Sequence, residues 1–459
     1  MSKHFDAIVI GTGQAGPSLA ARLAGAGMKV AIVERQKFGG TCVNTGCIPT
    51  KTLIASARAV HLTRRGAEFG FTVNGDVHVD MKRVKARKDE ISGRSNKGVE
   101  GWLRGLTNCT VIQGHARFVS PNSIFVNGET LSADKIFINV GGRANIPTFS
   151  GIHDVPFFTN SSMVNVDFLP EHLVIVGGGY IGLEFGQMYR RFGSEVTIIE
   201  MGPRLIRHED EDVSEAVKEI LEREGIRIRL NAKCISLAKR DDQIAVAVEC
   251  SENPTEIRGT HILIAVGRTP NTQDLDLEHA GIKTDARGYI IVDDELKTNV
   301  PGIWALGDCN GRGGFTHTAY NDYEIVADNL LNADRRRVSD RIRTYAVYTD
   351  PPLGRCGMTE AEIRKSGRAT LAVKHPMSKV GRAIEKGETQ GFIKIAVDAS
   401  TKQILGASIL GTGGDEVVQI LLDVMYAKAP YTVIEHAMHI HPTVAEFLPT
   451  VLSKLERLA

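Results

Sequence analysis

The chain of 459 residues has no long apolar run, and no stretch approaches the roughly 18 consecutive apolar residues of a membrane-spanning helix. Its first residues, MSKHFDAIVIG, lack the hydrophobic region and cleavage site of a secretory signal. The chain also has no large excess of one charge: its 55 Lys and Arg nearly balance its 54 Asp and Glu, which leaves a net charge of +1. We therefore expect a cytoplasmic protein that binds neither nucleic acid nor a membrane.

Cysteine is scarce as well, with seven residues scattered along the chain. An odd number spread in this way argues against the disulfide framework of a secreted domain. Hydrophobic residues (42%) and charged residues (24%) have the proportions of an ordinary globular protein. The length predicts two to four domains on a scale of about 150 residues each.

Two of the cysteines lie close together in the run GGTCVNTGCIPTK, as Cys42 and Cys47. Two sulfurs so near in sequence can form a disulfide with each other. In a reducing compartment such a pair is more often catalytic than structural. The alternative is half of a zinc site, which would need a second cysteine pair or histidines at matching spacing. The other cysteines of the chain supply no matching CxxC, so we predict a redox pair and no metal site.

A dinucleotide fingerprint opens the chain. A strand is predicted over Ala7–Ile10, followed by a glycine-rich turn, a helix, and a second strand over Val30–Val33 that ends on Glu34. The glycines of the turn are Gly11, Gly13 and Gly16. They allow a tight turn, close approach of the backbone to a pyrophosphate and packing of helix on strand, while the carboxylate accepts hydrogen bonds from a ribose.

The same pattern recurs in the middle of the chain. Strands are predicted over Leu173–Val176 and Val196–Ile199, and the second ends on Glu200. The glycines between them are Gly177, Gly179 and Gly182. Two complete fingerprints in one chain indicate two bound dinucleotides.

The remaining pattern is a mixture of strands and helices. Residues 111–126 and 226–248 alternate apolar and polar side chains and predict short strands of an antiparallel meander. Residues 265–271 predict a crossing between domains, and residues 302–308 predict another apolar strand. Met81–Arg104 reads as one long helix with a solvated, charged face; the alternative is guidance of an anionic ligand. Towards the C-terminus, a strand over Phe392–Val397 and a helix over Asp415–Ala427 are predicted.

Taken together, these motifs resemble the pyridine nucleotide-disulfide oxidoreductases. The resemblance rests on GGTCVNTGCIPTK, the two fingerprints, ALGD at residues 305–308 and HPTVAE at residues 441–446, in the family's order and over essentially the whole chain. It implies an α/β protein with two Rossmann-like dinucleotide-binding domains and a C-terminal α+β dimerisation domain. The implied bounds are 1–150 for the FAD domain, 151–269 for the NAD(P) domain, 270–338 for a return to the FAD domain and 339–459 for the interface domain.

The resemblance also implies FAD and a pyridine nucleotide as cofactors. The residues that would hold FAD are Gly11, Gly13, Gly16, Glu34, Gly40, Thr41, Lys51, Gly141 and Asp308. Those that would hold NAD(P) are Gly177, Gly179, Tyr180, Gly182, Glu200 and Gly267. Tyr180 stands where reductases of the family place a lid over the nicotinamide; the alternative is a packed aromatic. Glu200 favours NADH over NADPH, although Arg204 and Arg207 follow closely and arginine can hold a 2′-phosphate.

Six catalytic residues follow from the resemblance: Cys42, Cys47, Lys51, Glu184, His441 and Glu446. Cys47 would be the sulfur beside the flavin and Cys42 the outward sulfur that meets substrate. Lys51, one helical turn beyond Cys47, would pair with Glu184 near the flavin. His441, oriented by Glu446, would exchange protons with Cys42 of the partner subunit in a homodimer with shared active sites. Since His441 belongs to this motif, a metal cluster over His436–His441 is disfavoured.

The implied reaction passes electrons from NAD(P)H through the flavin to the Cys42–Cys47 disulfide and on to a small disulfide substrate. One alternative is a reductase of Hg(II) or Cu(II), because GCIPTKTL, PPLGRCGMTEAE and FTHTAYNDYEIV resemble mercuric-reductase-like and copper-reductase-like members. The absence of any cysteine after Cys356 weighs against mercury. A second alternative is dihydrolipoamide dehydrogenase, which HIHPT and Glu200 resemble, and a third is a non-catalytic binding protein. The residues assign no role to Cys109, Cys234, Cys250, Cys309 or Cys356.

Overall fold

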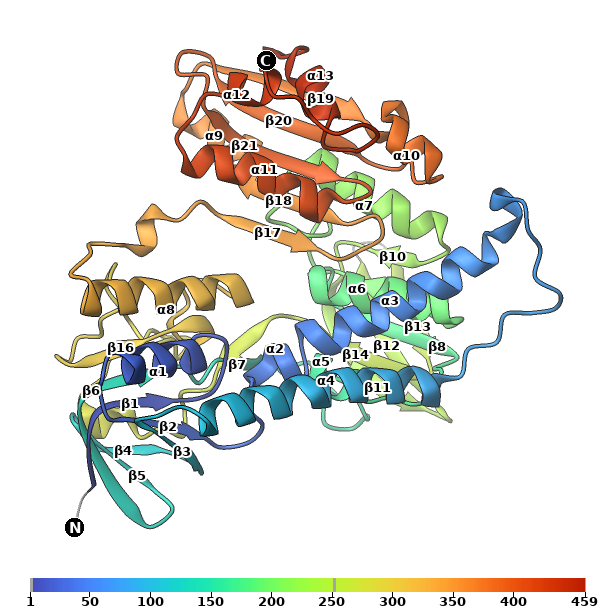
Figure 1. Ribbon diagram of the computed structural model, residues 1–459. Coiled ribbons are helices and arrows are strands. Elements are labelled where there is room, and N and C mark those ends of the chain that lie inside the picture. Colours follow the sequence, from blue (N-terminus) through green and yellow to red (C-terminus); the bar gives the residue numbers. More distant parts are fainter. Residues whose placement is uncertain (1–2, 251–252, 459) are drawn as a thin grey trace.

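Three sheet-based units make up the fold of the computed structural model, which describes residues 3–250 and 253–458 (Figure 1). The first unit lies around the N-terminal sheet, the second is built from the middle of the chain, and the third holds the C-terminal part. Among the helices of the described residues, none is both long and apolar enough to cross a membrane.

The first unit contains a seven-stranded sheet in the order β3-β2-β1-β6-β5-β4, with β16 paired to β6. Its strands are β1 (Lys3–Ile10), β2 (Val30–Glu34), β3 (Cys109–Gln113), β4 (Arg117–Ser120), β5 (Ser123–Val126), β6 (Glu129–Ile138) and β16 (Ile303–Ala305). β1, β2, β3, β6 and β16 run parallel, and β4 and β5 are antiparallel. Every residue of β2 is buried, as expected of a parallel strand covered on both faces.

Helices cover this sheet and extend from it. They are α1 (Gly16–Gly25), α2 (Gly40–Asn44), α3 (Cys47–Arg64), α4 (Met81–Arg104) and α8 (Thr316–Leu331). The helix predicted over Met81–Arg104 is confirmed with the same bounds, and Asp80 accepts a hydrogen bond from Arg83 N at its start. Figure 1 shows α3 and α4 side by side, reaching from the first unit towards the second.

The second unit has a parallel sheet in the order β10-β9-β8-β14 and a three-stranded antiparallel sheet, β11-β12-β13. The bounds are β8 (His172–Val176), β9 (Glu195–Ile199), β10 (Arg227–Arg229), β11 (Lys233–Arg240), β12 (Gln243–Cys250), β13 (Asn253–Gly259) and β14 (His261–Ile264). Its helices are α5 (Asn160–Met163), α6 (Tyr180–Phe192) and α7 (Glu211–Arg223). Two short strands, β7 (Gly142–Ala144) and β15 (Arg268–Pro270), pair where the chain crosses between the units, as predicted.

The prediction of two antiparallel meanders was wrong for the first strand of each segment. β3 joins the parallel edge of the first sheet beside β2, and β10 joins the second sheet beside β9. Only the later strands of each segment are antiparallel. The alternation of polar and apolar residues reflects an edge position, where one face of a parallel strand meets solvent.

The third unit is an antiparallel sheet in the order β17-β18-β21-β20-β19-β22. The bounds are β17 (Thr344–Val347), β18 (Leu353–Gly357), β19 (Thr370–Pro376), β20 (Phe392–Asp398), β21 (Ile404–Leu410) and β22 (Glu456–Arg457). Its helices are α9 (Glu360–Ser366), α10 (Gly381–Glu385), α11 (Gly414–Tyr426), α12 (Thr432–Glu435) and α13 (Phe447–Leu452). The predicted strand and helix at residues 392 and 415 are therefore present.

A buried ion cluster joins the third unit to the second. Arg355 of β18, only 2% exposed, donates to Glu209 at 3.0 Å and to Asp210 at 3.1 Å, both just before α7. Lys394 of β20 lies 3.4 Å from the same Asp210. Buried charges are tolerated only when they are paired in this way, so the cluster fixes where the third unit sits.

We expect Arg355→Met to destabilise the protein strongly, because Glu209 and Asp210 would stay buried without their main cation. Breaking a buried ion pair costs about 3–5 kcal/mol, whereas an exposed pair contributes at most about 1 kcal/mol. Lys3→Met is the matched control, since Lys3 and Glu129 form a pair with side chains 61% and 56% exposed. The midpoint of urea unfolding, followed by circular dichroism, should fall for the first variant only. Equal midpoints would contradict this account.

Candidate active site

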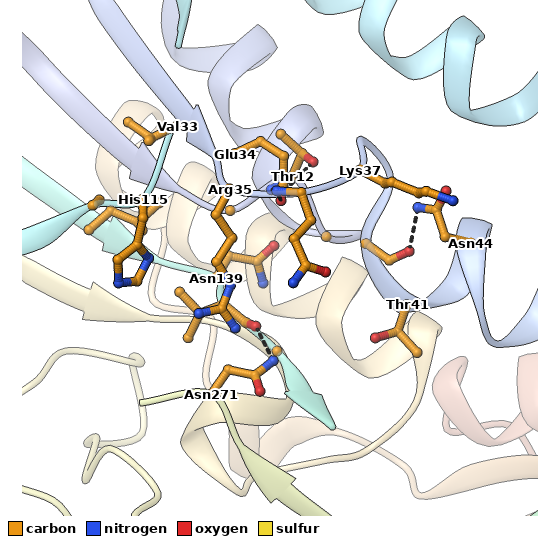
Figure 2. A pocket seen from close by; sticks show the side chains of 18 of the residues that line it. Thr12, Val33, Glu34, Arg35, Lys37, Thr41, Asn44, His115, Asn139 and Asn271 are labelled. Carbon is orange, nitrogen blue, oxygen red and sulfur yellow. Dashed lines mark hydrogen bonds between the residues drawn. The ribbon is translucent and has the colours of Figure 1, made fainter. Parts of the chain in front are cut away.

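The first fingerprint lies at the floor of a cavity of about 550 Å³ (Figure 2). Gly11 has φ +103° and its missing side chain would come within 2.4 Å of Asn139 O, so only glycine fits. Asn139 Oδ1 accepts a hydrogen bond from Gly16 N at 3.0 Å, which ties the turn to the end of β6. The turn therefore lines the cavity, and its hydrogen bond to Asn139 fixes its position.

Glu34 lines this cavity beside the fingerprint. Its Oε2 accepts hydrogen bonds from Thr12 N and Thr12 Oγ1 at 2.9 and 2.6 Å, and its Oε1 accepts one from Gln36 N at 2.8 Å. A carboxylate has about four acceptor positions, so one remains on Oε1 for a ribose hydroxyl. Figure 2 shows Glu34 beside Arg35 and Thr12 at the wall of the cavity.

A second cavity of about 610 Å³ continues from the first. Both are lined by Gly13, Thr41, Thr45, Asn139 and Gly141. Gly40 lies so close to Gly13 that a side chain on it would come within 2.8 Å of Gly13 Cα, so the loop before Cys42 lies against the fingerprint. Two adjoining cavities, lined by the glycine-rich turn and by the Glu34 carboxylate, fit an extended dinucleotide such as FAD.

Cys42 and Cys47 line the second cavity, Cys42 from α2 and Cys47 from the first position of α3. Both thiols are free in the structure, and Cys47 is exposed to the cavity. The Sγ of Cys47 lies 3.1 Å from the hydroxyl of Thr316, the first residue of α8. The sequence did not point to Thr316, although its place at the start of a helix after Gly314 and Phe315 was a possible signal.

The two thiols differ sharply in acidity. A hydrogen bond from Cys42, aided by one from Thr316 and by the charge of Lys51, outweighs the effect of burial and lowers the pKa of Cys47 to about 6. The same hydrogen bond, together with burial, raises the pKa of Cys42 above its ordinary value. At neutral pH the reduced pair therefore holds a thiolate at Cys47 and a thiol at Cys42, and the thiolate is the reactive form.

Lys51 and Glu184, which the sequence places far apart, form an ion pair of 2.7 Å at the edge of this cavity. Lys51 comes from α3 and Glu184 from the buried face of α6. The ammonium group also lies 4.5 Å from the centre of the Tyr348 ring. The other oxygen of Glu184 accepts a hydrogen bond from Tyr348 N at 3.1 Å. A cation is thus fixed near Cys47 by partners from two other parts of the chain.

Tyr180, at the start of α6, also lines the second cavity, one helical turn before Glu184. Its ring contacts Phe315 with centroids 5.5 Å apart, and burial raises the pKa of its hydroxyl to about 12. Phe315 in turn stacks on Tyr345 at 5.7 Å, and the Tyr345 hydroxyl donates to Glu209. The hydroxyl of Tyr180 is therefore neutral at physiological pH, and its ring is held in place by packing against Phe315, which in turn packs on Tyr345.

The second fingerprint repeats the geometry of the first. Gly177 has φ +117°, and a side chain there would come within 2.3 Å of Ala265 O. Glu200 accepts hydrogen bonds from Gly178 N and Gly202 N, both at 2.7 Å. Gly179 caps the start of α6, Gly182 lies in its first turn, and Gly267 follows β14 with φ +105°. The predicted nucleotide residues thus gather at the carboxyl ends of β8, β9 and β14.

His441 and Glu446 form the predicted pair but lie apart from the cysteines of the same chain. His441 Nδ1 is 3.0 Å from both oxygens of Glu446. The histidine side chain is 81% exposed, and the neighbouring Met438 and Ile440 are 100% and 80% exposed. Within the described residues, the lining of the second cavity ends at Tyr348 and does not include His441. An exposed histidine set among exposed apolar side chains indicates a surface that another subunit covers.

The other cysteines with described side chains, Cys109, Cys309 and Cys356, do not line either cavity. Cys309 and Cys356 are buried, and burial raises the pKa of each to about 12. Cys109 is partly buried in β3. The side chains of Cys234 and Cys250 lie outside the described residues. In the part of the chain that the structure describes, no group of three or more His, Cys, Asp or Glu side chains could hold a metal ion.

Comparison with known proteins gives consistent matches along the chain. Residues 5–322 match the family model of the pyridine nucleotide-disulphide oxidoreductases, and residues 344–452 match the model of their dimerisation domain. The probable pyridine nucleotide-disulfide oxidoreductase RclA of Escherichia coli K12 is 37% identical over 458 residues, covering 98% of this chain and 99% of the relative. The dihydrolipoyl dehydrogenase of Thermus scotoductus is 36% identical over 100% of this chain and 98% of the relative.

A mercuric reductase of Bacillus cereus is 31% identical over 90% of this chain and 66% of its own length. Among solved structures, a Cu(II) complex of the HOCl-induced flavoprotein disulfide reductase RclA of Escherichia coli superimposes with a TM-score of 0.90. That match is 36% identical and covers 99% of each chain. The resemblance predicted from the motifs, and the fold class with it, are confirmed.

Thr316→Val should raise the pKa of Cys47 above its value of about 6, because the thiolate loses a hydrogen-bond donor and keeps its proton more readily. Thr316→Ser keeps the hydroxyl and should leave the pKa unchanged. The measurement is the pH dependence of iodoacetamide alkylation in the reduced protein, with Cys47 followed by peptide mass spectrometry. If valine and serine give the same profile, the hydroxyl has no part in stabilising the thiolate.

Proposed function

Because the chain belongs to the pyridine nucleotide-disulphide oxidoreductase family, we propose that it is an NADH-dependent flavoprotein that reduces a small disulfide through Cys42 and Cys47. The family makes it a flavoprotein disulfide oxidoreductase; the substrate and the choice of NADH are our proposal. The observation that carries it is the unequal pair of thiols, with a thiolate stabilised at Cys47 by Thr316 and Lys51. The domain bounds predicted from the sequence and the expected cytoplasmic location stay predictions.

FAD would lie along the joined cavities, held by the residues predicted for it: Gly11, Gly13, Gly16, Glu34, Gly40, Thr41, Lys51, Gly141 and Asp308. When bound, it would accept a hydride from the pyridine nucleotide and pass two electrons to the cysteine pair. Gly177, Gly179, Gly182, Glu200 and Gly267 would hold the nucleotide. Tyr180 would cover the nicotinamide, and its packing against Phe315 supports this role.

Cys42 would perform the exchange with substrate. Its deprotonated sulfur attacks one sulfur of the disulfide RSSR and releases one RS⁻, which takes a proton and leaves as RSH. The Cys47 thiolate then attacks Cys42, releases the second RS⁻, which takes a proton from solvent, and re-forms the Cys42–Cys47 disulfide. We propose that His441 of the partner subunit, supported by Glu446 in the manner of a catalytic dyad, accepts the Cys42 proton and returns it to the leaving thiolate. The matched dimerisation domain and the exposure of His441 support a homodimer with shared sites.

A second candidate is reduction of Cu(II), favoured by the 36% identity to the RclA structure solved with that ion. Two Cu(II) ions would each take one electron from the Cys42 thiol and Cys47 thiolate, giving two Cu(I), one proton and the Cys42–Cys47 disulfide. Thiolate sulfur binds copper well, so the same two residues suffice for this reaction. The dihydrolipoyl dehydrogenase match keeps dihydrolipoamide as a third candidate.

Anaerobic reduction of the purified protein by NADH, followed by addition of single oxidants, tests the proposal. The oxidants are glutathione disulfide, other low-mass disulfides, lipoamide, Cu(II) and Hg(II), and the true substrate should reoxidise the protein rapidly. Cys42→Ser should abolish reoxidation by that substrate while NADH still reduces the protein. Cys109→Ser is the control and should behave as the unchanged protein, since Cys109 lies on β3 away from the cavity. Turnover that survives Cys42→Ser would refute the central assignment.

Glu200 should set the preference for NADH. Its charge repels the 2′-phosphate of NADPH, and a charge interaction of about 1.4 kcal/mol corresponds to a tenfold preference. We therefore expect Glu200→Gln to lower the ratio of kcat/KM for NADH to kcat/KM for NADPH by about tenfold. Glu195→Gln is the control, because Glu195 opens β9, is exposed and pairs with Arg227. A strong preference of the unchanged protein for NADPH would overturn the choice of NADH.

A further inference from the structure

Asp322 is a buried carboxylate of α8 that none of the roles above uses. It is 2% exposed and faces the short 3-10 helix η3 (Gly307–Asn310). Its Oδ2 accepts a hydrogen bond from Gly307 N at 2.7 Å and one from Asn310 Nδ2 at 3.0 Å. A buried acid with two donors on a single short segment determines where that segment lies.

Arg341 supplies the countercharge. Its Nη2 donates to Asp322 Oδ1, and its Nε donates to Asn321 Oδ1 at 2.7 Å. Burial raises the pKa of Asp322, and Arg341 opposes that rise together with the donors from η3. Within the described residues, Arg341 Nη1 has no hydrogen-bond partner, so the guanidinium group is committed to this carboxylate and to Asn321.

The segment that Asp322 holds carries Asp308. Gly307 and Asp308 both line the second cavity, and the Asp308 carboxylate lies 3.3 Å from Arg268. On the other side, Asn139 Nδ2 donates to Leu306 O at 2.9 Å. Asn139 Oδ1 also accepts a hydrogen bond from Gly16 N of the first fingerprint. The Gly307–Asp308 turn is therefore hydrogen-bonded to Asp322 on one side and, through Asn139, to the fingerprint on the other.

We propose that Asp322, together with Arg341, is a positioning residue that holds the Gly307–Asp308 turn against FAD and thereby determines how tightly the cofactor is retained. The inference rests on the proposed use of FAD. Arg341 lies three residues before β17, and the amide of the adjacent Ile342 donates to the Tyr426 hydroxyl of α11 at 3.2 Å. The third unit is therefore anchored at the same place that holds the cofactor turn.

The alternative is that the pair only stabilises the fold. A fold effect lowers the unfolding temperature with and without added FAD by the same amount. A positioning effect lowers the extra stabilisation that bound FAD provides, because that stabilisation depends on cofactor affinity. The two effects are thus separated by comparing the unfolding temperature of each variant with and without excess FAD.

The experiment follows the release of FAD from the diluted holoenzyme by the rise in flavin fluorescence. We expect Asp322→Asn to release FAD at least about tenfold faster, since a hydrogen bond to a charged acceptor is replaced by a weaker one. Arg341→Met should also accelerate release, and Arg341→Lys should restore much of the retention. Arg22→Gln is the matched control, because it breaks an ion pair of 2.7 Å with Asp328, which lies on the same helix as Asp322. Neither Arg22 nor Asp328 lines a cavity, so release should stay unchanged.

Release of FAD at the unchanged rate from both Asp322→Asn and Arg341→Met would overturn the inference. So would an equal loss of unfolding temperature with and without FAD in both variants. These outcomes leave the proposed function intact, because they require that the unchanged protein binds FAD. A preparation of the unchanged protein that binds no FAD would instead refute the proposed function and this inference with it.

Discussion

The carboxylate of Glu184 is the point on which the site depends, because it joins three parts of the chain. One oxygen holds Lys51 of α3 at 2.7 Å, and the other accepts the amide of Tyr348, which follows β17. Glu184 itself belongs to α6, the helix that opens with the second fingerprint. Its side chain is only 4% exposed, so it loses hydration that these two partners replace. Any shift of one unit against another would leave this charge without a partner.

Further polar contacts along α6 hold the units in one arrangement. One turn further on, Gln187 exchanges two hydrogen bonds with the backbone of Asp350, at 2.7 and 2.8 Å. Arg191, another turn on, pairs with Asp350 at 2.5 Å and with Glu224 at 2.7 Å. Arg58 of α3 also pairs with Asp350. Polar contacts of this kind are directional and gain little from a displaced geometry, so they define relative position better than apolar packing does.

Local features of the fold were predictable from the sequence, and contacts between distant segments were not. The strands around both fingerprints and the helix over Met81–Arg104 follow from periodicity and from glycine spacing, which act over a few residues. The partner of Lys51 was found only through resemblance to a family, because 133 residues separate it from Glu184. Thr316, 269 residues from Cys47, was missed altogether. The pairing of the edge strands was misjudged since alternation reports exposure and does not report strand direction.

The unequal acidity of the two thiols has a consequence for the assembly. The thiolate at Cys47 is stabilised within one chain, by Cys42, Thr316 and Lys51. Cys42 is in the opposite condition, since the bond that stabilises its neighbour makes its own proton harder to remove. To act as a nucleophile, Cys42 needs a base. Among the described residues that line its cavity, the only histidine is His317. Burial lowers the pKa of His317, and its Nε2 already bonds Thr344 O. The exposed His441, with its carboxylate already in place, has the chemistry that Cys42 lacks. On the proposed mechanism, the dimer is therefore required by proton transfer at Cys42, whereas the thiolate beside the flavin is complete in each chain alone.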